Sequence, residues 1–134
     1  MAALAAIPLF EGLTSGELQG IADLMTPRDV PAGTLLTEQD APGSEAMIVV
    51  SGTALVRRGG RVIDESGPGD LIGEISLITR APRSATVEAT SDMSLLVIGA
   101  DHFTAMLEAT PDLAVKIRRT VAARDAASTG PGTI

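Results

Sequence analysis

The sequence predicts a mainly β domain, an antiparallel β-roll of the jelly-roll type with flanking helices. Three observations carry this prediction: a helix-start signal near the N-terminus, short apolar runs between turn residues in the middle, and helical periodicity near the C-terminus. The 134 residues suit one domain, and an apolar content of 45% supplies enough side chains for a core. We therefore expect a single domain over residues 1–127 and a flexible, Gly- and Pro-rich tail over residues 128–134.

The N-terminal helix is predicted from its start signal. Thr14 and Glu17 have the spacing of a capping box, in which each side chain bonds the backbone N–H of the other residue. Apolar residues follow at helical spacing and indicate a short amphipathic helix from about Ser15 to Met25. Pro27 then ends the helical character.

The middle of the chain, from Val30 to Ala100, has the texture of a β-roll. Short apolar or alternating runs are separated by breaks rich in glycine and proline. The runs predicted as strands are Thr34–Glu38, Met47–Ser51, Thr53–Arg57, Arg61–Glu65, Ser84–Ala89 and Met93–Ile98. Gly59 and Gly60 indicate a tight hairpin turn, because glycine accepts the positive φ values that such turns need.

Two helices are expected after the roll. Asp101 can cap a short helix that runs through Glu108. Thr110 and Pro111 then form the pattern of an N-cap followed by proline at the first helical position. An apolar stripe continues the second helix to about Ala127.

Charge and composition bear on several classes of function. The net charge of −7 and the absence of Trp and Tyr weigh against a nucleic-acid partner, which usually needs a basic face or aromatic stacking. With no Cys and a single His, His102, the sequence predicts no metal site and no cofactor. No apolar stretch is long enough for a membrane helix, and the start of the chain lacks the charge pattern of a signal peptide. We therefore expect a cytoplasmic protein with no membrane partner.

Residues 73–86 contain the side chains and backbone groups best suited to bind a ligand. Their sequence is Gly-Glu-Ile-Ser-Leu-Ile-Thr-Arg-Ala-Pro-Arg-Ser-Ala-Thr. A short helix that begins after Gly73 would present free N–H groups to an anion. Arg83 can add two parallel hydrogen bonds to the same anion, while Ser84 and Ala85 add a hydroxyl and a backbone N–H. The ionised carboxylate of Glu74 can only accept hydrogen bonds, so it suits the hydroxyl of a sugar. The segment therefore suits a sugar phosphate.

This segment resembles the phosphate-binding cassette of the cyclic nucleotide-binding domain family. The family pattern is Gly-Glu-apolar-small-Leu, a short insert, and then Pro-Arg-(Ser/Thr/Ala)-Ala-(Thr/Ser), and every position is filled here. The resemblance extends over about residues 7–125. It implies that Glu74 binds the ribose 2′-hydroxyl and that Arg83 binds the cyclic phosphate. It implies further ligand contacts from the short cassette helix and the following turn, at Gly73, Ile75, Ser76, Ser84 and Ala85.

Contacts to the base of the nucleotide are expected from the last helix, since the chain has no Tyr or Trp that could cap the base. The candidates are Ile117, Thr120, Val121 and Arg124. A solvated helix face accounts for Thr120 and Arg124 equally well. Three positions differ from the common family residue and are interpreted as packing substitutions: Gln39, Met47 and Ile72.

The main hypothesis is a stand-alone regulatory or sensor module that binds a cyclic nucleotide and has no enzymatic activity. The expected ligand is cAMP, with cGMP as the alternative. Binding would close the C-terminal helices as a lid, and a protein partner or self-association would then detect the change. One alternative is a degenerate cyclic nucleotide-binding fold that acts as a protein interaction module without ligand. The other is a metal-dependent β-roll enzyme of the cupin type.

Overall fold

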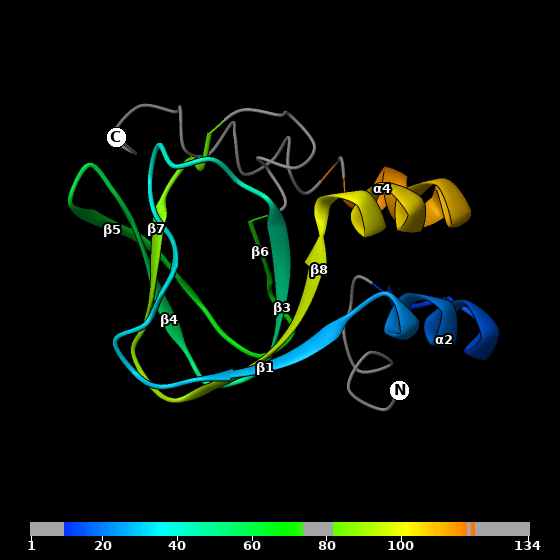
Figure 1. Ribbon diagram of the computed structural model, residues 1–134, viewed down its shortest axis with the longest axis horizontal. Helices are drawn as coiled ribbons and strands as arrows, with labels where there is room; N and C mark the ends of the chain where they lie inside the picture. Colours follow the sequence, from blue (N-terminus) through cyan, green and yellow to red (C-terminus); the bar gives the residue numbers. More distant parts are fainter. Residues whose placement is uncertain (1–9, 74–81, 118, 120–134) are drawn as a thin grey trace.

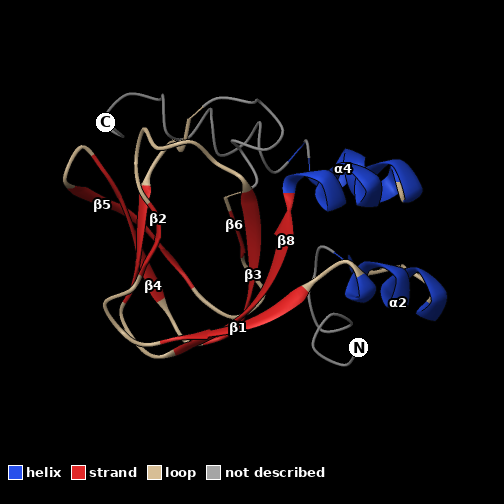
Figure 2. Cartoon of the chain, in the orientation of Figure 1, coloured by secondary structure: helices blue, strands red, loops and turns tan. Residues whose placement is uncertain are grey.

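The structure is a computed structural model that describes residues 10–73, 82–117 and 119, and it contains two four-stranded antiparallel sheets. The sheets face each other, and the helices lie on the outer side of one of them (Figures 1 and 2). The first sheet has the order β1 (Thr26–Val30), β8 (Met93–Gly99), β3 (Glu45–Ser51) and β6 (Leu71–Ile72). The second has the order β2 (Leu35–Thr37), β7 (Thr86–Ala89), β4 (Ala54–Arg58) and β5 (Arg61–Ser66). This architecture confirms the predicted β-roll.

Strand β3 separates two cores because both of its faces are buried. Met47 and Val49 belong to the cluster between the two sheets, whereas Ala46 and Ile48 belong to the cluster under the helices. Successive side chains of a strand point to opposite faces, which is why the two sets alternate. The between-sheet cluster also contains Ile72, so two of the three predicted packing substitutions, Met47 and Ile72, are confirmed.

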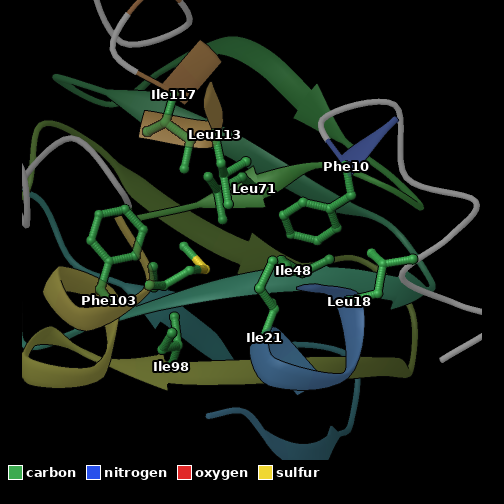
Figure 3. Close-up of a cluster of buried hydrophobic side chains, with 11 residues drawn as sticks. Phe10, Leu18, Ile21, Ile48, Leu71, Ile98, Phe103, Leu113 and Ile117 are labelled. Carbon is green, nitrogen blue, oxygen red and sulfur yellow. The ribbon is translucent and has the colours of Figure 1, made fainter. Parts of the chain in front are cut away.

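The helical part packs on the outer face of the first sheet. It consists of α2 (Ser15–Asp23), α4 (Ala100–Ala109) and a helical segment over residues 111–117. Figure 3 shows the shared cluster, in which Phe10, Leu18, Ile21, Phe103, Leu113 and Ile117 meet Ile48, Leu71 and Ile98 of the strands. Phe103 is 2% exposed, which confirms its expected place in the core.

The strands largely follow the sequence pattern, and each predicted run overlaps a strand. Two short strands, β1 and β6, were not predicted. Pro27 was predicted to end the helical character, and it does lie beyond α2; it is part of β1, which is an edge strand of its sheet. An edge strand tolerates proline because one of its sides needs no N–H donor.

The helix starts are partly as predicted. The capping box is present, with Glu17 N–H donating to the Thr14 hydroxyl and Thr14 N–H donating to the Glu17 carboxylate. The residues after Thr110 are helical, also as predicted. The prediction of Asp101 as a cap was wrong, because the N-cap of α4 is Gly99 and Asp101 lies in the first turn. An acidic residue there still stabilises the positive end of the helix. The predicted cassette helix and the tail lie outside the described residues.

Candidate functional site

Arg83 is the central residue of the candidate site, and it is only 7% exposed. Its Nη1 donates to the carbonyl of Gly73 at 2.9 Å, and its Nη2 donates to the carbonyl of Glu45 at 2.8 Å. These carbonyls come from the end of β6 and the start of β3. They fix the plane of the guanidinium, and a planar guanidinium is the group best suited to bind a phosphate through two parallel hydrogen bonds.

Gly73 leaves the space that this guanidinium occupies. A Cβ atom at this position would lie 2.4 Å from Nη1 of Arg83 and 3.1 Å from the carbonyl oxygen of Glu45. Gly73 also has a φ of +84°, a conformation that costs side-chain-bearing residues free energy. The structure thus brings Gly73 and Arg83, two of the residues proposed for the ligand site, into direct contact.

The backbone of Arg83 is anchored to the loop between β2 and β3. Its N–H donates to Ala41 O, and its carbonyl accepts from Asp40 N–H, both at 2.8 Å. Asp40 has a φ of 70°. Aspartate tolerates this left-handed conformation better than most residues. The residue in this conformation is the one whose N–H donates to the Arg83 carbonyl.

The next two residues are anchored through their carbonyls. The Ser84 carbonyl accepts from Nε of Arg58 at 2.8 Å, and the Ala85 carbonyl accepts from the buried hydroxyl of Thr37 at 2.9 Å. Among the hydrogen bonds of the described residues, neither the Ser84 N–H nor the Ala85 N–H donates to a protein acceptor. Ala85 is only 8% exposed, and backbone donors in buried segments are nearly always paired. These two amides are therefore suited to an anionic ligand beside Arg83.

An ion pair lies behind the site. The carboxylate of Glu45 accepts from Nη1 of Arg28 at 2.8 Å, while the carbonyl of the same residue holds Arg83. The hydrogen bond with Glu45 raises the pKa of Arg28 above its ordinary value, so Arg28 stays charged at any working pH. Since this carboxylate has a cationic partner of its own, the pair lowers the local negative charge that an anionic ligand would meet.

Gln39 has a role that the sequence analysis missed. Its side-chain Oε1 accepts from the N–H of Gly59 at 2.8 Å, and its own N–H donates to the hydroxyl of Thr86 at 2.9 Å. Gln39 therefore connects the tip of the β4–β5 hairpin to the start of β7, and its interpretation as a packing substitution was wrong. No local sequence signal indicates these contacts, because Gln39 is distant in the chain from both Gly59 and Thr86 and no motif relates the three residues.

The remaining candidate residues differ in their outcome. Ile117 is fully buried in the cluster under the helices, so its side chain packs in the core and its prediction as a base contact is not supported. The physical reason is that the apolar stripe of this helix faces the first sheet. The other candidates lie outside the described residues: Glu74, Ile75, Ser76, Thr120, Val121 and Arg124.

Comparison with known proteins identifies the family. The model of the cyclic nucleotide-binding domain matches residues 27–110, a range that contains both Gly73 and Arg83. The chain belongs to the cyclic nucleotide-binding domain family. This confirms the resemblance that was based on the cassette sequence.

Relatives in this family include regulatory proteins of several kinds. A cyclic nucleotide-gated potassium channel of Rhizobium etli is 36% identical over 90% of this chain and 34% of the channel. The catabolite activator protein of Thermus thermophilus has a TM-score of 0.80 and 31% identity over 87% of this chain and 57% of that one. The regulatory domain of Toxoplasma gondii protein kinase A, solved with cAMP, has a TM-score of 0.71 and 33% identity over 78% of this chain and 42% of that one. The chain thus spans about a third of the curated channel that it matches.

No helix among the described residues is both long enough and apolar enough to cross a membrane. Within the same residues, no group of three or more His, Asp or Glu side chains is arranged to hold a metal ion.

Proposed function

We propose that this domain binds the phosphate of a cyclic nucleotide through Arg83 and the amides of Ser84 and Ala85, and that the ligand is cAMP. The observation that carries the proposal is the juxtaposition of a buried, doubly held guanidinium with two backbone donors that have no acceptor among the described residues. Such a set of donors matches the charge and geometry of a cyclic phosphate. The choice of cAMP is supported by the related kinase regulatory domain that was solved with it.

The ribose and the base would be held by residues of the family pattern outside the described part of the chain. We propose that Glu74 accepts a hydrogen bond from the ribose 2′-hydroxyl, and that Ile75 and Ser76 contribute backbone N–H groups to the phosphate. Thr120, Val121 and Arg124 remain the proposed contacts to the base. A carboxylate on the ribose predicts a weaker complex with a 2′-deoxy ligand, since the deoxy ligand lacks the donor that Glu74 needs.

The proposed output is a movement of the helices, and the described contacts offer a route for it. Arg83 holds the Glu45 carbonyl, and the preceding Ser44 carbonyl accepts from the N–H of Ala100, the first residue of α4, at 2.9 Å. A ligand that pulls on Arg83 therefore acts on the strand end that positions α4. Only a ligand that binds one arrangement of the helices more tightly can shift their population. We propose that a protein partner or self-association reads this shift, that the domain acts in regulation rather than catalysis, and that it needs neither metal nor nucleic acid.

Calorimetric titration tests the proposal directly. The protein is unfolded and refolded to remove carried ligand, and cAMP and cGMP are then titrated separately. We expect cAMP to bind more tightly, and Arg83→Gln to cost about 2–5 kcal/mol of binding free energy because it removes a desolvated charged contact.

Arg61→Gln serves as the matched control, since it removes an exposed charge that has no hydrogen bond to the described residues of the site. Its affinity should stay within about threefold of the unmodified protein at physiological salt, because screening limits its effect to that of a distant charge. A folded protein that is silent towards both nucleotides would contradict the proposal and favour the ligand-free interaction module. Equal affinities of Arg83→Gln and the unmodified protein would instead refute the site.

A further inference from the structure

Arg58 contacts the site from outside the cassette. It is the last residue of β4, and the Gly59-Gly60 turn separates it from Arg61, its direct partner on β5. Val56, two residues earlier, packs against the cluster between the sheets. Residues two apart on a strand share a face, so Arg58 lies on the face of β4 that is turned towards the roll interior. From there its Nε donates to the Ser84 carbonyl at 2.8 Å.

This hydrogen bond controls a ligand donor through the geometry of the peptide bond. The carbonyl of Ser84 and the N–H of Ala85 belong to one planar trans peptide and point in opposite directions. A guanidinium that holds the carbonyl on one side therefore fixes the direction of the Ala85 N–H on the other side. That N–H has no protein acceptor among the described residues, and it is one of the donors proposed for the phosphate.

The hairpin that carries Arg58 is itself held in place. The N–H of Gly59, the next residue, donates to Gln39, whose own N–H bonds Thr86 at the start of β7. Like charges directly opposite each other on paired strands are destabilising, so Arg58 opposite Arg61 does not serve the stability of the hairpin. The Ser84 carbonyl gives Arg58 a partner that Arg61 lacks among the described residues.

We infer that Arg58 is a positioning residue of the ligand site, which aims the Ala85 N–H at one exocyclic oxygen of the cyclic phosphate. The inference rests on the proposed function and deepens it, because it assigns a role in phosphate recognition to a residue of the β4–β5 hairpin. It also explains why Gln39 fixes the hairpin tip: a displaced hairpin would withdraw the guanidinium and release the Ser84–Ala85 peptide.

The test compares Arg58→Gln with Arg61→Gln, two variants that remove the same charge from opposite sides of one turn. Each is titrated with cAMP and with the two phosphorothioate diastereomers, in which sulfur replaces one or the other exocyclic oxygen. We expect Arg58→Gln to weaken cAMP binding about five- to twentyfold, as for the partial loss of a hydrogen bond to a charged group. We also expect it to bring the ratio of the two diastereomer affinities closer to one, whereas Arg61→Gln should preserve the ratio.

A second measurement follows the Ala85 amide itself. In the ¹⁵N–¹H spectrum, the shift change of this amide on adding cAMP should be large in the unmodified protein and smaller in Arg58→Gln. Should Arg58→Gln fail to fold, Arg58→Lys provides the same comparison, because an ammonium lacks the rigid geometry of a guanidinium. If the unmodified protein binds cAMP but the Arg58 variants keep both its affinity and its diastereomer ratio, the role of Arg58 is refuted. If the unmodified protein binds no nucleotide, the proposed function fails and this inference fails with it.

Discussion

A glycine with positive φ lies at each end of β3, and the two glycines have different roles. Gly52, just after the strand, and Gly73, beside its first residue, both have positive φ and no room for a Cβ atom. At Gly52 the atom in the way is the carbonyl oxygen of Asp92, and at Gly73 it is the guanidinium of Arg83. The missing side chain therefore allows two backbone segments to approach closely at the Gly52 end. At the Gly73 end it makes space for a charged side chain.

The polar groups at the two ends differ accordingly. At the Gly52 end, the hydroxyls of Thr53 and Thr90 lie 2.8 Å apart, and Thr53 N–H donates to Ser91 while Thr90 N–H donates to the Thr53 carbonyl. The protein satisfies its own donors there. At the Gly73 end, the amides of Ser84 and Ala85 find no protein acceptor among the described residues. Hydrogen bonds within the protein stabilise the fold at the Gly52 end. At the Gly73 end, backbone donors without a protein acceptor among the described residues can bind a ligand.

Among changes at the two ends of β3, the largest effect is expected from Gly73→Ala, and it concerns binding. The added methyl group overlaps the guanidinium of Arg83, so the charge must leave its place and about 2–4 kcal/mol of binding free energy should be lost. Titration with cAMP measures this loss. Gly33→Ala is the matched control, because its φ of +90° imposes a similar backbone cost in open space and it lies outside the β4–β5 hairpin. If Gly33→Ala weakens binding as much as Gly73→Ala does, backbone strain accounts for the effect and the overlap does not.

Gly52→Ala should lower stability instead of affinity. Its methyl group would lie 2.4 Å from a backbone oxygen, which cannot move as a flexible side chain can. We expect a loss of about 2–3 kcal/mol in the free energy of unfolding, measured by denaturant titration. Gly33→Ala has nearly the same φ, +90°, with nothing within 4 Å, and should lose only about 1 kcal/mol. Equal losses in the two variants would show that the contact with Asp92 contributes nothing.

The smallest effect is expected from Glu45→Gln. Arg83 uses the main-chain carbonyl of Glu45, so affinity for cAMP should change less than about twofold. The ion pair with Arg28 is exposed on both sides, 46% and 31%, and its removal should cost less than about 1 kcal/mol of stability. That cost should shrink further at high salt. A loss of affinity as large as that of Gly73→Ala would mean that the side chain, and not the backbone, supports the site.

The sequence predicted the order of the elements well because local signals determine it. The capping box of Thr14, the turn at Gly59 and Gly60, and the apolar runs all act within a few residues, and the structure follows them. The N-cap at Gly99 was missed because the chain turns from β8 directly into α4, with no side chain to mark the boundary.

The candidate site could be proposed from the sequence only where a family pattern spans it. Gly73 and Arg83 were proposed as ligand contacts from the cassette sequence; the structure places them in contact with each other, and their role in ligand binding stays a prediction. The hydrogen bonds from Arg58 to Ser84 and from Gly59 to Gln39 join residues from separate strands and loops. The pairing of β7 with both β4 and β2 brings them together, so no periodicity or local motif could have revealed them.

The pairing of β1 with β8 has a consequence for how such a domain is used. These are the first and last strands of the roll, and Thr26 lies opposite Val97 in their register. The backbone therefore enters and leaves the roll at neighbouring strands of one sheet. A unit whose entry and exit lie close together can be inserted into a longer polypeptide without forcing the flanking segments apart. Strand pairing at this one edge thus makes the roll suited to serve as one domain within a longer chain.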